Sequence, residues 1–165
     1  MSKRENTFFP YSSATGASER VNCAMKILPA YCGSHGKVWR AEQYAVRFFS
    51  LKKYGDHASA DTVIRIMQCE LKHVSLLGEL IRKLGVNPVG INCSTRYEWF
   101  SRIGRNNITP KKILTDCIAE EINTVLYFEG LVKGIDDNNV KKVLRGIIDD
   151  DGLHVNELKK CLSKF

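Results

Sequence analysis

Hydrophobic positions follow a helical period over most of the chain. In residues 38–54 and 59–85, apolar side chains recur mostly at steps of three or four, the spacing of one helix face. The same period returns in residues 110–135 and 140–162, and no stretch competes with it by showing the alternation typical of a strand. The pattern therefore predicts an all-α chain with four long helices.

The segments between these helices differ in length. The stretches "GDHAS" and "DDNN" are short polar turns, whereas residues 86–108 form a long connection whose middle, "TRYEWFSRI", has room for a turn or two of helix. Thr109 and Pro110 form a good helix start, and Ser59 and Asp61 are candidate caps of the second helix. We therefore expect an antiparallel four-helix bundle with one long crossover between helices 2 and 3, which is a ferritin-like connectivity.

Residues 1–36 differ in composition from the rest of the chain. They are rich in serine, glycine and charged residues, and Pro10 and Pro29 are expected to break helices, although "ERVNCAMKIL" can form a short helix before Pro29. A chain of 165 residues is long enough for one well-cored domain. We expect a partly irregular N-terminal arm at residues 1–36 and the bundle at residues 37–165.

Two of the predicted helices carry a carboxylate and an imidazole three positions apart. These pairs are Glu70-x-x-His73 and Asp151-x-x-His154, and a valine follows the histidine in both. A single pair of this kind often arises by chance on a solvated face. Here the two carboxylates and the two histidines have the same separation along the chain, as in a duplicated hairpin. The repetition favours a shared metal site, because charges placed on inner faces are costly unless paired or metal-bound.

A site of this type needs one more carboxylate from each of the other two helices. Because a helix rises about 1.5 Å per residue, these carboxylates must lie as far from the turn as their partners do. Glu42 and Glu70 lie almost equally far along the chain from the two ends of the first turn, and Glu121 and Asp151 do so for the second. Glu120 is the alternative to Glu121, which we favour because the apolar and small residues around it continue its face.

Charge and cysteine usage narrow the class of protein. The formal net charge is +7, but the lysine pairs are scattered over helix ends and polar faces, so we expect solvated surface and no nucleic-acid partner. No apolar run approaches the roughly 20 residues of a membrane span, and the chain start lacks the apolar core of a secretory signal. We expect a cytoplasmic protein with no membrane partner. The six cysteines never form a C-x-x-C pair, which removes support for a rubredoxin-like metal module.

Three of these helical stretches resemble the rubrerythrin branch of the ferritin-like superfamily. "ELKHVSLLGELIRKLGVNP" resembles its helix 2, "AEEINTVLYFEGL" its helix 3 and "VKKVLRGIIDDDGLHVNELKKCL" its helix 4, and the resemblance covers about residues 38–162. It implies two iron ions, or alternatively two manganese ions. The six residues that it implies as metal ligands and catalytic groups are Glu42, Glu70, His73, Glu121, Asp151 and His154. Asp151 departs from the family, which usually has glutamate there.

The resemblance also implies a function. It predicts a non-haem di-iron oxidoreductase of the peroxidase or oxidase type that acts on peroxide or O2 and forms a homodimer. Because the chain has no rubredoxin module, a separate protein must donate the electrons. A dimanganese catalase and a ferroxidase or iron-storage protein are alternatives within the class. The alternative from a different class is a metal-free helical bundle used for protein interaction.

Overall fold

The structure is a computed structural model that describes residues 17–33, 36–88 and 109–165. Every secondary-structure element in these ranges is an α-helix, which confirms the predicted all-α class. The helices are α1 (Ala17–Cys32), α2 (Lys37–Lys53), α3 (His57–Lys83), α5 (Pro110–Lys133) and α6 (Asn138–Leu162). None of the described helices is both long and apolar enough to cross a membrane.

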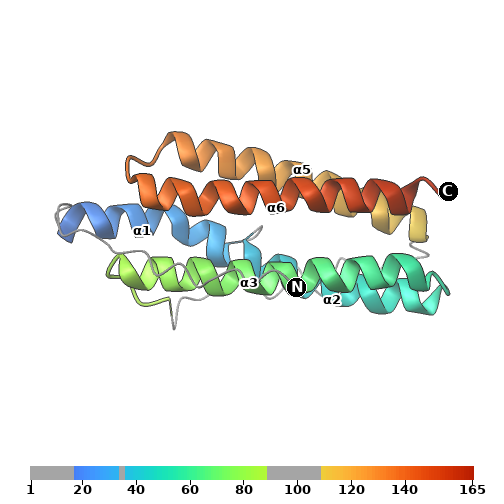
Figure 1. Cartoon of the computed structure of the whole chain (residues 1–165). Helices are drawn as coiled ribbons and strands as arrows, with labels where there is room; N and C mark the ends of the chain where they lie inside the picture. The colour runs from blue at the N-terminus through green and yellow to red at the C-terminus, as the bar shows by residue number, and fades with distance from the viewer. Residues whose placement is uncertain (1–16, 34–35, 89–108) are drawn as a thin grey trace, which may run out of the picture.

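The helices form two hairpins that pack against each other. Figure 1 shows α2 beside α3 in one layer and α5 beside α6 in the other, with α1 and α2 following one another along the length of α3. Antiparallel helices joined by short turns therefore face each other as predicted. Residues 89–108, which make up most of the long connection after α3, and residues 1–16 of the expected arm lie outside the described residues.

Side chains at the helix starts explain where α3 and α5 begin. Thr109 caps α5, as expected, by accepting a hydrogen bond from the backbone N–H of Lys112 at 3.3 Å, with Pro110 in the first turn. The cap of α3 is Asp56, whose carboxylate accepts from the N–H of Ser59 at 3.1 Å. The prediction of Ser59 or Asp61 as the cap is therefore wrong, because the helix begins about one turn earlier.

Helix α1 extends beyond its predicted end. Pro29 lies inside the helix, which continues to Cys32, so the expected break at this proline does not occur. Ala24, Ile27 and Ala30 are fully buried and pack in one cluster with residues of α3 and α5, two helices that α1 lies against. Packing on both sides of the proline stabilises the helix there, and α1 contributes to the core of the bundle.

Two apolar clusters occupy the two halves of the bundle interior. The first contains α1 together with Leu77 and Ile81 of α3 and Leu144 and Ile147 of α6. The second contains residues from the opposite ends of the same helices, including Ile66 of α3 and Leu158 of α6, together with Tyr44, Leu51, Ile113 and Leu114. Between these clusters the buried residues are Glu70 and His73 of α3 and Asp151, His154 and Val155 of α6, and all but the valine are polar or charged. The bundle therefore has a polar layer between two apolar ends.

Candidate metal centre

The polar layer is built from residues that occupy the core stripe of each helix. In α3 the buried positions run Ile66, Glu70, His73 and Leu77, and in α6 they run Ile147, Asp151, His154 and Leu158, with steps of four, three and four in both. The same spacing that buries the apolar residues therefore also buries both carboxylate–histidine pairs. The layer exposes at most 6% of any member and comprises Lys37, Arg40, Glu70, His73, Glu121, Asp151 and His154.

The structure brings five of the six predicted site residues together. Glu70, Glu121, Asp151 and His154 each offer one ligand atom within 4.8 Å of the others, a grouping that could hold a metal ion. His73 lies beside them, with Nδ1 3.6 Å from Oε2 of Glu70 and 3.7 Å from Oδ1 of Asp151. Glu121 rather than Glu120 occupies the interior, because Glu120 keeps 29% of its side chain exposed and pairs with Arg47.

Glu42 is not part of this group. It is exposed on the outer side of α2, as is Phe49, which is 70% exposed two turns further along. The inner face of α2 instead carries Arg40, Tyr44 and Leu51, at steps of four and seven. The expectation that Glu42 faces the other carboxylates is therefore corrected. Glu42 lies only two positions after Arg40, but its direction around the helix axis places it outside.

Two buried cations, Lys37 and Arg40, reach the carboxylates. The sequence pattern of carboxylates and histidines did not reveal them. Lys37 Nζ lies 2.7 Å from both carboxylate oxygens of Asp151 and 3.1 and 3.0 Å from Oε1 and Oε2 of Glu70. The lysine therefore bridges the carboxylates of α3 and α6.

Arg40 and the hydroxyl of Tyr44 both donate to Oε1 of Glu121. The steps from Lys37 to Arg40 to Tyr44 are three and four, so the helical period places both cations on the buried face of Tyr44. That signal was available in the sequence, although nothing in it marks a buried lysine or arginine as distinct from a solvated one.

Burial and charge together set the protonation of the layer. Burial alone would lower the pKa of Lys37, but Glu70, Asp151 and Glu121 outweigh it and hold that pKa above its usual value. Burial would also lower the pKa of each histidine. The interaction with Cys69, together with the nearby negative charge of Glu70 for His73 or Glu121 for His154, raises both pKa values to about 10. Without a metal, the lysine and both histidines are therefore positively charged at neutral pH.

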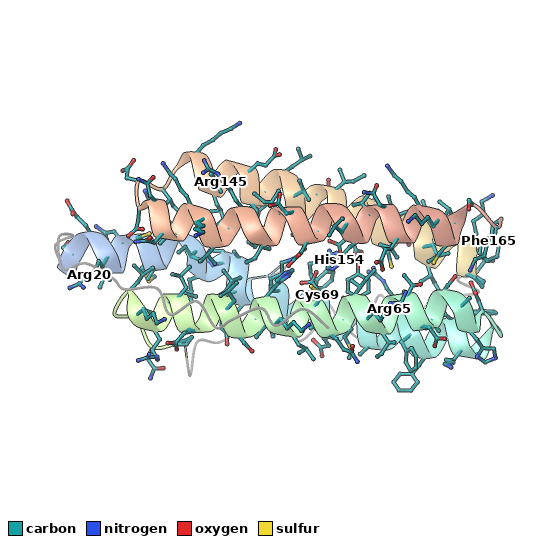
Figure 2. All side chains as sticks on the ribbon, viewed as in Figure 1. Arg20, Arg65, Cys69, Arg145, His154 and Phe165 are labelled. Carbon is teal, nitrogen blue, oxygen red and sulfur yellow. The ribbon has the colours of Figure 1, made fainter. Side chains whose placement is uncertain are left out.

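The outer nitrogen of His73 is tied to a second group of residues. Its Nε2 lies 3.1 Å from Oδ2 of Asp150 and 3.7 Å from Sγ of Cys69, whose pKa hydrogen bonds with His154 and His73 lower to about 7. Figure 2 shows Cys69 and His154 on either side of the space between α3 and α6. A carboxylate on the outer nitrogen of a histidine fixes the ring so that its other nitrogen can bind a metal. Asp150 therefore orients Nδ1 of His73 inward.

Several inward-facing ligand atoms remain without a hydrogen bond. Within the described ranges, the buried side-chain atoms of this kind in the layer's ligand set are His73 Nδ1, Glu121 Oε2 and His154 Nδ1, whereas Glu70 Oε2 lies 3.0 Å from Lys37 Nζ. His154 Nδ1 lies 3.7–3.9 Å from one oxygen each of Asp151, Glu70 and Glu121, which is too long for hydrogen bonds. Ligands of one transition-metal ion at roughly 2.1 Å from it lie about 3 to 4 Å from one another. The donor set on the His154 side therefore fits a metal ion.

A bundle of this connectivity with a buried carboxylate–histidine cluster has the ferritin-like fold. No protein-family model and no curated protein matches the sequence. The structure is similar to a bacterioferritin with a diiron site from Desulfovibrio desulfuricans, at a TM-score of 0.71 and 18% identity, over 90% of this chain and 84% of the other. Two structures of a manganese catalase from Anabaena give TM-scores of 0.71 and 0.73 at 20% and 21% identity, over 99% of this chain and 80% of the catalase. At these identities the similarity establishes the fold.

Proposed function

We propose that the protein is a ferritin-like redox metalloprotein that binds iron, or alternatively manganese, in the polar layer and reduces peroxide or O2. The observation that carries this proposal is the convergence of Glu70, Glu121, Asp151 and His154 within 4.8 Å at the centre of the bundle. Mixed carboxylate and imidazole donors suit both metals. The diiron bacterioferritin and the manganese catalase that share the fold support the same class of chemistry.

The side chains of the layer have distinct roles in this proposal. Glu70, Glu121, Asp151 and His154 would hold the metal ion, whose chemistry would be the supply of electrons to the oxidant, and His73 is available from the neighbouring turn of α3. Arg40 and Tyr44 hold Glu121 through Oε1, which leaves Oε2 directed at His154. The apolar clusters at both ends of the layer exclude water and so strengthen these electrostatic interactions.

The partners follow from the reaction. The oxidant is peroxide or O2, and a separate protein donates electrons, because the sequence has no C-x-x-C pair from which a rubredoxin-like module could be built. A homodimer is part of the proposal by resemblance. Reductant use separates the forms of the activity: a peroxidase consumes reductant with peroxide, a catalase releases O2 without reductant, and a storage protein accumulates many iron ions per chain.

A metal-free helical bundle for protein interaction is the second candidate, and one observation favours it. Lys37 and Arg40 are internal cations that already pair with Glu70, Asp151 and Glu121. Buried carboxylates need a positive partner, and here the chain provides two. This candidate predicts that the fold is complete without metal and that added metal leaves its stability unchanged.

Metal analysis of the purified full chain separates the two candidates. The protein is expressed with added iron or manganese, and the metal content per chain is measured by mass spectrometry together with peroxide consumption in the presence of a chemical reductant. We expect bound metal and reductant-dependent peroxide consumption. His154→Ala should lose the metal while circular dichroism shows an unchanged helix content, because its Nδ1 belongs to the free donor set.

The matched control is His57→Ala, which removes an exposed histidine from the first turn of α3. It should keep the metal content and the activity of the natural protein. A chain that stays folded but carries neither iron nor manganese after supplementation would refute the proposed function and support the metal-free bundle.

A further inference from the structure

Lys37 occupies an unusual place for a lysine. It is the first residue of α2 and fully buried, and its ammonium group contacts both oxygens of Glu70 and both oxygens of Asp151. A cation at a helix N-terminus is opposed by the helix dipole, and a buried ammonium group loses its hydration. Both costs are offset by residues of other helices. The two carboxylates therefore hold the ammonium group in the layer.

Lys37 contacts both carboxylate oxygens that lie within 4 Å of Nδ1 of His73, whereas near Nδ1 of His154 a third oxygen, Oε2 of Glu121, is not a contact of Lys37. Oε2 of Glu70 lies 3.0 Å from the lysine Nζ and 3.6 Å from Nδ1 of His73, and Oδ1 of Asp151 lies 2.7 and 3.7 Å from the same two atoms. A cation ligated by Nδ1 of His73 would need these oxygens, which the ammonium group already contacts. The His73 side of the layer is thus occupied by a positive charge.

The His154 side of the layer differs, because two of its ligand atoms are free. His154 Nδ1 and Oε2 of Glu121 face each other at 3.9 Å, and both lack a hydrogen bond. Among the described residues, the compact donor group of the layer includes His154, whereas His73 groups with Cys69 and Asp150 outside it. Arg40 takes the other oxygen of Glu121, Oε1, and leaves Oε2 available. The ligand geometry of the layer therefore offers one position for a metal ion.

The net charge of the polar layer also favours a single metal ion. The fully buried carboxylates Glu70, Glu121 and Asp151 contribute −3 and the buried Lys37 and Arg40 contribute +2, so these five side chains together carry a charge of −1. One divalent ion changes this to +1, and two would change it to +3. Uncompensated charge in a buried site is strongly unfavourable. The layer accommodates one divalent ion at a much lower electrostatic cost than two.

We propose that the ammonium group of Lys37 takes the place of one of two metal ions, so that the polar layer binds a single divalent transition-metal ion on the His154 side. This inference rests on the proposed function in that it concerns the same metal site. Replacing Lys37 with glutamate removes one positive charge and supplies a carboxylate. Two divalent ions in that variant give the same net charge of +1 that one ion gives in the natural protein.

The test compares Mn²⁺ binding by the full-length natural protein and by Lys37→Glu. Equilibrium dialysis with elemental analysis should give one Mn²⁺ per chain for the natural protein and two for the variant. The electron paramagnetic resonance spectrum of the variant alone should show the exchange coupling of adjacent Mn²⁺ ions. Lys53→Glu is the matched control, because it makes the same charge change at an exposed position of the same helix. It should still bind one ion without exchange coupling.

A second variant and a second measurement guard against a folding defect. Lys37→Gln removes the charge without adding a carboxylate and should take up the additional ion more weakly. In both Lys37 variants the thermal midpoint should rise more on addition of Mn²⁺ than it does in the natural protein. His73→Ala in the natural background should keep its ion, whereas His154→Ala should lose it.

The outcomes separate this inference from the function. Two ions in the natural protein, or no gain in either Lys37 variant, would overturn the role of Lys37 and leave the metalloprotein function in place. A gain of one ion in Lys37→Glu over a natural protein that binds none would refute the function and retain the role of Lys37. Binding by none of the chains would overturn both.

Discussion

Arg40 and Glu121 form a buried ion pair that the Tyr44 hydroxyl completes. Both charged side chains are at most 2% exposed, and Arg40 and Tyr44 donate to the same carboxylate oxygen. Two charges removed from water offset each other's desolvation only while both are present. The pair therefore fixes Glu121 in the layer whether or not a metal is bound.

Removing Arg40 should leave a buried carboxylate without its main partner. We expect Arg40→Met to lower the free energy of unfolding by about 3–5 kcal/mol, measured by urea denaturation in the presence of a chelator. Arg82→Met, which breaks the exposed pair with Glu79, is the control and should leave the unfolding curve unchanged. Similar curves for the two variants would show that the buried pair contributes little.

At the scale of single helices, the starts and ends follow local chemistry. Asp56 and Thr109 satisfy backbone donors in the first turns of α3 and α5. Gly85 follows α3 with a φ of 93°, a left-handed conformation that glycine adopts most readily. These signals act over a few residues, and those at Thr109 and Gly85 were read from the sequence, whereas the cap of α3 was expected at Ser59 or Asp61 and lies at Asp56.

The cap of α3 can be tested with two aspartates that lie close together. Asp56→Ala removes the acceptor of the Ser59 N–H and should destabilise the protein by about 1 kcal/mol. Asp61→Ala removes a carboxylate that is 63% exposed and has a contact of 4.0 Å with Lys52, so it should have a much smaller effect. Thermal denaturation of both variants under the same conditions provides the measurement, and the reverse order would contradict the assignment of the cap.

At the scale of the molecule, α1 and α2 together cover the length of α3 (Figure 1). Helix α1 adds Ala24, Ile27 and Ala30 to the apolar cluster on one side of the polar layer, and α2 adds Tyr44 and Leu51 to the other. The break between α1 and α2 comes just before Lys37, which lies in the layer itself. The stability of α1 is therefore coupled to that of the whole bundle.

This coupling predicts a large effect from a single residue of α1. Ile27→Ala creates a cavity beside α3 and α5 and should destabilise the whole protein by about 2–5 kcal/mol in a single unfolding transition. Met25→Ala, on the side of the same helix where that residue is 53% exposed, should change stability far less. Loss of α1 helicity without a change in the main transition would show that α1 is not part of the core.

Local sequence was sufficient for the helices, the two hairpins and the level of the two carboxylate–histidine pairs, because these depend on periodicity and on a fixed rise per residue. It also favoured Glu121 over Glu120 through the residues that share its face. The two pairs lie inside for a simple reason: each continues an apolar stripe with steps of four, three and four.

Tertiary packing decided which charged side chains face one another in the polar layer. Glu42 follows Arg40 closely along α2 but faces away from the layer, whereas Lys37 and Arg40 face into it. Height along a bundle follows from counting residues, but the direction of a side chain depends on how the whole helix packs against its neighbours. For the same reason the course of α1 through Pro29 was set by its contacts with α3 and α5, which no local pattern in residues 17–32 specifies.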